Sequence, residues 1–434
     1  TLWSREWNSG IFRHCLDTAI RNPQKFIFMS ATNPLWASAV LLTERMVQPM
    51  DKPTVQDIFH RFYPAYLDQY SPSPVQAKVA HNIMNCKTGA YGANVCVCED
   101  CGFVQIHYNS CRNRCCPMCQ AVPKEMWMDA RREDVLDAPY FHLVFTVPDI
   151  LNPVIYSNQR LLYDALYHAA SSTISELTAD PKHLGAKVGY ICILHTWGSE
   201  MNFHPHIHTI LLGGGLASNN QWKDNGENFF LPIRVISKMF RGKYLEELKR
   251  LWEEDKLVFH GTAEKFRNHY TFKELLDSCY GMDWIPHCKK TFNGAQTVIK
   301  YLGKYTHPHR IAVSNHRIVR MDDDTVTFLV KDYRNEGQWK ELTISGVEFV
   351  RRFLMHVPPR RFVRIRHYGL LCSRTKSQKL TLCRNLLGCK KYLSKLRDME
   401  MPEILEHLYG IKVCVCKACG GHLGKPQMRM PLRC

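Results

Sequence analysis

Two histidines in residues 203–212 are placed to bind one metal ion. The segment reads FHPHIHTILL, so the apolar Ile207 separates His206 from His208. On a strand, side chains two residues apart project from the same face, which directs both imidazoles to one side and Ile207 into the core. Neutral imidazoles are good ligands for divalent metals. A lone His pair is more often structural, so the metal interpretation depends on a second feature.

That second feature is a pair of tyrosines in the segment KYLGKY. Tyr301 and Tyr305 are four residues apart and would share one face of a helix, with Lys300 and Lys304 beside them. Such spacing is also common for core tyrosines. Facing a metal held by a strand, however, a tyrosine hydroxyl could attack a phosphodiester and form a covalent 5′-phosphotyrosine. We therefore expect these tyrosines to be nucleophiles and the two lysines to contact DNA.

The third metal ligand is open at this stage. Glu200 is the first choice because it could return from the turn before the histidine segment, and His195 and His309 are the alternatives. Phosphoryl transfer favours Mg²⁺ or Mn²⁺, although a set of histidines alone would also suit zinc.

A cysteine-rich block, CVCEDCGFVQIHYNSCRNRCCPMC, predicts a structural zinc site. It contains two Cys-x2-Cys pairs, which is a specific zinc-binding signal. We expect the ligands to be Cys98, Cys101, Cys116 and Cys119. Three further cysteines could substitute for one of these or help to bind a second ion: Cys96, Cys111 and Cys115.

A third Cys-x2-Cys pair near the other end of the sequence is a weaker signal. Cys416 and Cys419 are followed by two glycines and form half of a zinc ribbon. No further Cys-x2-Cys pair follows, so the sequence leaves open whether this pair belongs to a zinc site or is unmetallated. The residues that could complete it are Cys414, His422 and Cys434.

The charge of the chain points to a polyanionic partner. The formal net charge is +17, and a large excess of cations is typical of nucleic-acid binding. Residues 351–380 contain nine Lys or Arg and no acid. Cations alternate there with aromatic residues, a composition that suits phosphate contact and base stacking. The predicted DNA-contacting residues are Arg360, Arg361, Arg364 and Arg366. No apolar run is long enough to predict a membrane span.

The elements that must position these residues indicate an α+β fold. Alternating and apolar patterns predict strands at 140–147, 188–197 and 207–212, and helical periodicity covers 155–178, 233–255 and 293–305. The order predicts a mainly antiparallel sheet with flanking helices. We divide the chain into an extension of unknown function (1–50), a helical and zinc-binding domain (51–130), a nuclease domain (138–335) and a basic DNA-contacting region (336–434).

Three segments together resemble the rolling-circle transposases of bacterial insertion sequences. They are YNSCRNRCCPMCQ, HTWGSEMNFHPHIHTILLGGG and YLGKYTHPHRIAVSNHRI, in the expected order. The resemblance implies an HUH-type nuclease fold with an N-terminal zinc-binding domain, acting in the bacterial cytoplasm at the nucleoid. It also implies cleavage and joining of single-stranded DNA at the element's ends. By position, His206 and His208 match the metal-binding pair, and Tyr301 and Tyr305 match the tyrosines; Cys115 departs from the pattern, which has His there.

Two other functions compete with this one. A non-catalytic zinc-dependent DNA-binding protein, the product of a decayed element, would bind DNA without nicking it. A hydrolytic zinc enzyme would use the histidine pair but would not need Tyr301 or Tyr305.

Overall fold

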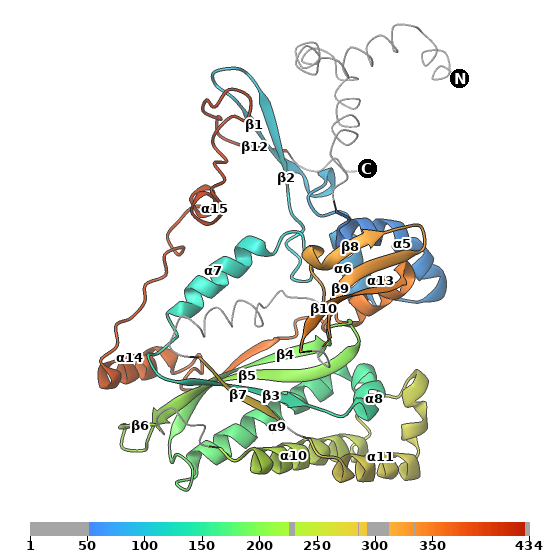
Figure 1. Cartoon of the computed structure of the whole chain (residues 1–434), viewed down its shortest axis with the longest axis vertical. Coiled ribbons are helices and arrows are strands. Elements are labelled where there is room, and N and C mark those ends of the chain that lie inside the picture. Colours follow the sequence, from blue (N-terminus) through green and yellow to red (C-terminus); the bar gives the residue numbers. More distant parts are fainter. Residues whose placement is uncertain (1–51, 225–230, 285, 293–311, 333–335, 430–434) are drawn as a thin grey trace. The chain divides into compact units, whose positions relative to one another are not determined.

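The computed structural model describes residues 52–224, 231–284, 286–292, 312–332 and 336–429 (Figure 1). The chain divides into two units, Thr1–Lys52 and Pro53–Cys434, and all the described helices and strands lie in the second. The predicted extension at 1–50 and the predicted helix at 293–305, with Lys300, Tyr301, Lys304 and Tyr305, lie outside the described residues.

The largest sheet carries the histidine segment. It has six strands in the order β11–β4–β5–β3–β7, with β6 paired to β5, and every pairing is antiparallel. The sheet confirms the predicted α+β class and its mainly antiparallel character. Its strands are β3 (Tyr140–Thr146), β4 (Lys187–Trp197), β5 (Phe203–Leu216), β6 (Trp222–Asp224), β7 (His287–Phe292) and β11 (Ile365–Gly369).

Helices cover one face of this sheet (Figure 1). Phe141, Leu143 and Phe145 of β3 alternate along the strand and pack into the same core as Ile207 of β5. The histidines therefore lie on the opposite face. The helices of this layer are α8 (Asn152–Ser157), α9 (Gln159–Ala179), α10 (Ile233–Glu253) and α11 (His269–Gly281).

Helix α11 lies between 255 and 293, a stretch in which the sequence analysis predicted no element. Asn268 caps it by accepting a hydrogen bond from the Tyr270 amide, and Phe272, Leu275 and Cys279 are buried along one side. A side-chain cap and apolar residues at helical spacing are enough to form a helix in a polar segment.

A second core joins segments that are far apart in the sequence. Helices α5, α6 and α13 pack with a three-stranded sheet of order β10–β9–β8. The predicted regions 51–130, 138–335 and 336–434 each contribute to this core. The elements are α5 (Val55–Gln69), α6 (Pro74–Met84), α13 (Gly346–Met355), β8 (Ile318–Met321), β9 (Thr325–Asp332) and β10 (Gln338–Ser345).

A small third sheet brings the first cysteine-rich block, residues 96–119, together with the chain around Cys416 and Cys419. Strand β12 pairs with β1, and β1 pairs with β2. The remaining elements are β1 (Ala93–Val97), β2 (Val104–Tyr108), β12 (Gln427–Arg429), α7 (Ala121–Arg132), α14 (Lys376–Leu387) and α15 (Met401–Tyr409). Among the described residues, every helix is too short or too polar to cross a bilayer.

Candidate metal centres and nucleic-acid interface

Three histidines from two neighbouring strands meet on the face of the large sheet opposite the helices α8 to α11. His195 of β4 lies directly opposite His206 of β5, and Ile193 lies opposite His208. Residues opposite each other in an antiparallel pair share a face. The ligand nitrogens of His195, His206 and His208 all lie within 4.8 Å of one another, which is compact enough for one ion.

Hydrogen bonds orient two of these rings toward a common point. The Nδ1 of His206 donates to the carbonyl oxygen of His204 at 2.7 Å, since a carbonyl can only accept. The neutral ring then carries its lone pair on Nε2, which lies 3.0 Å from Nε2 of His208. On its other side, Nδ1 of His208 lies 2.8 Å from Nε2 of His142. Fixing one ring nitrogen in this way is how proteins orient metal-binding imidazoles.

The environment of His206 keeps its ring in the form that binds metals. Burial, reinforced by the neighbouring His204, lowers the pKa of His206 to about 3. A neutral imidazole offers its lone pair to a cation, whereas a protonated one cannot. The two facing Nε2 atoms, one of them on the neutral ring of His206, therefore fit a bound divalent cation.

Glu200, the first-choice third ligand, is not part of this cluster. It lies in the turn between β4 and β5, and its side chain is about half exposed, with a carboxylate oxygen 4.0 Å from Nζ of Lys340. Arg352 also donates to its backbone carbonyl, at 2.9 Å. The turn lies beyond the ends of the strands, whereas His195 is brought to His206 by strand pairing. The alternative residue His195 thus lies in the cluster where Glu200 was expected, and His309 lies outside the described residues.

His142 is a site residue that the sequence analysis did not identify. It lies on β3 opposite Ile210, on the same face as His208, and its ring is parallel to that of His208 at 5.1 Å. Its position on a strand was predictable, but its contact with His208 depends on the register between β3 and β5. These two strands are neighbours in the sheet but not consecutive in the sequence, so no short segment of the chain contains that register.

The four predicted zinc ligands do not form one site. Cys116 and Cys119 cluster with Cys86 and Cys111, and we call these four residues the inner cysteine cluster. Within it, Sγ of Cys111 lies 3.8 Å from Sγ of Cys119. Cys86 was missed because it stands alone in the sequence, without a Cys-x2-Cys partner.

Cys98 and Cys101 instead meet the cysteines from the other end of the unit. Cys98 lies 3.5 Å from Cys419 and Cys101 lies 3.7 Å from Cys416, measured between sulfur atoms. We call these four residues the outer cysteine cluster. The predicted grouping was wrong because the β1–β2 hairpin separates the two pairs: Cys98 and Cys101 are at its turn, and the inner cluster is at its base. Five residues of strand span roughly 17 Å.

The four arginines predicted to contact DNA have different surroundings. Arg364 is buried, with its guanidinium over the ring of Trp197 at 5.0 Å. Arg366 is ion-paired with Asp164 and lies over the ring of Tyr167 at 4.0 Å. Burial of Arg364 argues against the DNA contact predicted for it, whereas the contact predicted for Arg366, which is partly exposed, stays a prediction.

Arg360 and Arg361 are exposed and belong to a basic pocket. The pocket has a volume of about 340 Å³ and is also lined by Lys78 and Arg114, with no acidic residue among its lining residues. Arg114 also donates to the carbonyl oxygen of Phe362 at 2.6 Å, which holds it in place. Four cations converging on one hollow are suited to a phosphate group.

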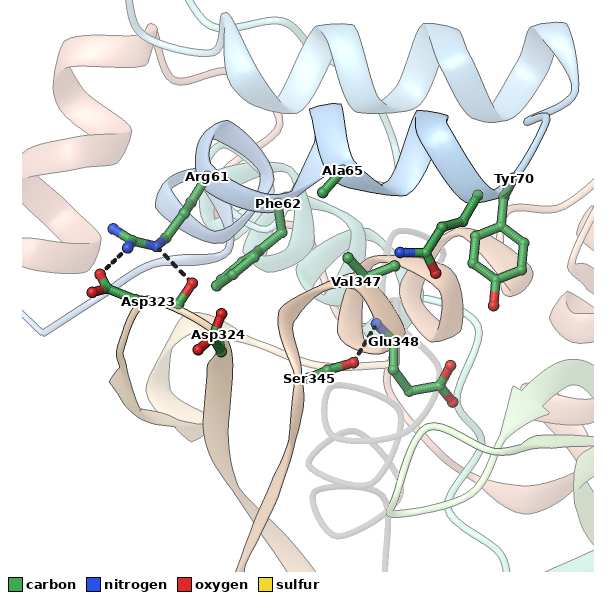
Figure 2. Close-up of a pocket in the computed structure, with 10 residues that line it drawn as sticks. Arg61, Phe62, Ala65, Tyr70, Asp323, Asp324, Ser345, Val347 and Glu348 are labelled. Atoms are coloured by element: carbon green, nitrogen blue, oxygen red, sulfur yellow. Dashed lines mark hydrogen bonds and ion pairs between the residues drawn. The ribbon is translucent and has the colours of Figure 1, made fainter.

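A larger pocket, of about 580 Å³, is less suited to an anion. It lies where α5 meets the β8–β9 turn and the start of α13, and Figure 2 shows Arg61 reaching Asp323 across one edge. Asp324 and Glu348 also line it. The acidic residues outnumber Arg61, so we assign no DNA contact to this pocket.

Comparison with known proteins defines the class. Residues 58–147 match the "Transposase zinc-binding domain" family, and residues 189–379 match a family described as "Putative transposase". The first match includes the inner cluster and His142, and the second includes all three clustered histidines. Cys416 and Cys419 lie outside both matches.

Two curated relatives place the chain within a family. It is 40% identical over 371 residues to "Putative transposase y4qJ" of Sinorhizobium fredii, covering 85% of this chain and 93% of that protein. It is 30% identical over 311 residues to the "Transposase for insertion sequence element IS801" of Pseudomonas savastanoi pv. phaseolicola, covering 70% and 72%. The chain belongs to this family of insertion-sequence transposases.

A solved structure of the conjugative relaxase TrwC, in complex with oriT DNA and metal-bound, matches only part of the chain. The match covers 25% of this chain and 43% of that one, at 16% identity and a TM-score of 0.22. A likeness this low supports no argument about fold or activity.

Proposed function

We propose that this protein cleaves and rejoins single-stranded DNA at the ends of an insertion sequence through a 5′-phosphotyrosine intermediate. The observation that carries the proposal is the buried cluster of His195, His206 and His208 on one face of an antiparallel sheet, in a chain of the transposase family. Tyr301 and Tyr305 are the proposed nucleophiles.

The covalent step conserves the energy of the phosphodiester bond. The tyrosine oxygen bonds to phosphorus, the bond from phosphorus to the 3′ oxygen breaks, and the departing strand keeps a 3′-hydroxyl with the transferred proton. Attack by a 3′-hydroxyl on the phosphotyrosine reverses the step and rejoins DNA without a nucleotide triphosphate. Two tyrosines would allow two successive transfers.

The three histidines would hold the catalytic cation, for which we propose Mn²⁺ or Mg²⁺. A divalent cation at this point supplies Lewis-acid stabilisation of charge on the scissile phosphate. Because all three donors are imidazoles, we expect Mn²⁺ to bind more tightly than Mg²⁺. The role of His142 would be to fix the orientation of His208 through their 2.8 Å contact.

The DNA backbone would be bound by the exposed cations. We propose that Arg360 and Arg361, together with Lys78 and Arg114, hold a phosphate in the basic pocket. Lys300 and Lys304 would contact DNA beside the tyrosines. Arg364 would instead hold the chain before β11 against the rest of the protein, and Arg366, which is partly exposed, stays a proposed DNA contact.

The decisive experiment is adduct formation with single-stranded oligonucleotides that carry the element's ends, in the presence of Mn²⁺. The native chain should give a denaturation-resistant protein–DNA adduct, and the double variant Tyr301→Phe, Tyr305→Phe should give none. Tyr270→Phe is the matched control, since Tyr270 is 76% exposed and outside the proposed site. An adduct with the double variant would reject these nucleophiles. Salt-sensitive binding without any adduct from the native chain would favour the non-catalytic DNA-binding protein.

A second experiment tests the metal ligands. His195→Ala should slow cleavage by at least roughly 100-fold, because losing a ligand removes several kcal/mol of charge stabilisation. His142→Ala should weaken Mn²⁺ binding by about 10- to 100-fold, as expected for a residue that orients a ligand. Glu200→Gln should change neither by more than about threefold. A large effect of Glu200→Gln with none of His195→Ala would restore the original ligand choice.

A further inference from the structure

The two halves of the outer cysteine cluster have the same local structure. Each is a Cys-x2-Cys-Gly turn, and the glycines Gly102 and Gly420 have φ values of +72° and +78°. In each turn the glycine amide donates to the carbonyl oxygen of the first cysteine, at 3.0 Å for Gly102 and 2.9 Å for Gly420. Two matching turns that present four thiols to each other form a zinc ribbon.

Backbone amides point at the sulfurs of the C-terminal turn. Ala418 donates to Sγ of Cys416 and Gly421 donates to Sγ of Cys419, both at 3.4 Å. An amide that faces sulfur stabilises the negative charge of a thiolate, which is the form that binds metal. All four sulfurs lie within 4.8 Å of one another.

Strand pairing independently brings the two turns together. β12 pairs with β1 in an antiparallel register, and a bridge joins Cys98 to Leu423. The amide of Glu99 donates to the carbonyl oxygen of His422 at 3.1 Å, and that of Gly424 donates to Val97 at 2.9 Å. Residues 422–424, just after the C-terminal turn, are thus held against the hairpin on either side of Cys98.

The apolar core around this cluster is too small to hold these segments together. Apart from three cysteines, its buried member is Leu423, with Phe103 packed against it. Small units without a sizeable core need a metal or disulfides to fold. The segment leading to the ribbon also contacts α7, where the Leu396 amide and the Ser394 hydroxyl donate to Asp129.

We propose that one zinc ion, bound by Cys98, Cys101, Cys416 and Cys419, ties the C-terminal segment to the β1–β2 hairpin. This ion is distinct from the one at the inner cluster. The ribbon uses a turn from inside the matched zinc-binding domain and a turn from outside it. The proposal concerns the assembly of the chain and does not depend on DNA cleavage.

Zinc stoichiometry of the purified full-length chain tests the proposal. All variants carry His206→Ala and His208→Ala, so that the histidine cluster does not contribute. Replacing Cys416 and Cys419 by Ser should remove one zinc per chain, and replacing Cys98 and Cys101 should remove one. The matched control is Cys372→Ser with Cys389→Ser, two partly buried cysteines outside the clusters, and it should remove none.

The variant that lacks all four cysteines decides whether the ion is shared. A shared ion predicts that this variant also loses one zinc, whereas two separate ions predict a loss of two. Loss of two zincs, or no loss from the Cys416, Cys419 pair, would overturn the proposal.

Hydrogen exchange gives a second readout that does not depend on metal counting. In the Cys416, Cys419 variant, the amides of β1 and β12 should exchange at least tenfold faster, and those of the large sheet should be unchanged. Unchanged exchange in β1 and β12 would show that zinc does not hold the ribbon, even if a metal binds there.

Discussion

The inner and outer cysteine clusters each consist of four cysteines, but the surroundings of the two clusters differ. In the inner cluster, Cys86 and Cys116 are fully buried and belong to the core that includes Phe59 and Phe353. In the outer cluster, Cys101 and Cys419 are exposed, and the surrounding core is minimal. The inner cluster is thus supported by packing as well as by any metal, whereas the outer one depends on its metal and on a few strand hydrogen bonds.

The difference in surroundings implies different effects of the two metal sites on the stability of the protein. A metal embedded in a large core contributes to the stability of everything packed around it. A metal at the tip of a hairpin closes a long loop and affects mainly the segments it joins. Substitutions at equivalent positions should therefore have different consequences, which the following predictions quantify.

The largest contrast is expected between Cys116→Ser and Cys416→Ser. Cys116→Ser should lower the free energy of unfolding by more than about 4 kcal/mol, because it removes a metal ligand from within the core. Cys416→Ser should change the main unfolding transition by less than about 1 kcal/mol. Denaturant unfolding of the zinc-loaded chain, followed by circular dichroism, measures both. Equal losses would show that the clusters do not differ in this way.

A second contrast compares the apolar residues beside each cluster. Phe59 is fully buried and lies edge-to-face with Phe353 at 5.1 Å, so Phe59→Ala should cost about 3–5 kcal/mol in the main transition. Leu423→Ala should leave that transition within about 1 kcal/mol and speed hydrogen exchange only in β1 and β12. A comparable loss of global stability from Leu423→Ala would mean that the ribbon is part of the main cooperative unit.

A smaller effect is expected from Gly420→Ala. A Cβ at Gly420 would meet no atom within 4 Å, so only its left-handed backbone opposes the substitution. The strain of about 1–2 kcal/mol should weaken zinc binding at the outer cluster by roughly 5- to 30-fold, measured by competition with a chelating indicator. Gly242→Ala is the control: Gly242 lies within α10, also in open space, and the substitution should stabilise the chain by about 0.5–1 kcal/mol. Undiminished zinc affinity in Gly420→Ala would show that zinc binding does not depend on the left-handed backbone at this position.

The smallest effect is expected from His422→Ala. The His422 side chain is 66% exposed and lies 3.4 Å from Glu99. It is not in the group of four cysteines, although the sequence left it open as a ligand. The variant should keep its full zinc content and change stability by less than about 0.5 kcal/mol. Loss of one zinc would make His422 a ligand and displace one of the cysteines.

Much of the fold could be predicted from local patterns. The alternation in 140–147 and the apolar run in 188–197 correspond to β3 and β4, and the periodicity in 155–178 corresponds to α9. Helix α11 was not predicted, since its apolar residues are few and face one side of the helix. The predicted tyrosine helix lies outside the described residues, so it stays a prediction.

The candidate site was predicted less completely than the fold. His206 and His208 follow from alternation within one strand, and the structure brings them together. The choice of His195 over Glu200 needed the register between β4 and β5, and the role of His142 needed the register between β3 and β5. A shift of one residue in either pairing would turn these side chains to the other face.

By itself, the sequence determined features that depend on a few consecutive residues. It placed two imidazoles on one face of a strand and formed each Cys-x2-Cys-Gly turn, because backbone geometry repeats over such short spans. Only the tertiary structure decided which of these local units meet. Cys101 and Cys416 are 315 positions apart, and their contact depends on the return of the chain to β1. Spacing in the sequence carries no information about that contact, because strand pairing and packing across the whole unit determine it.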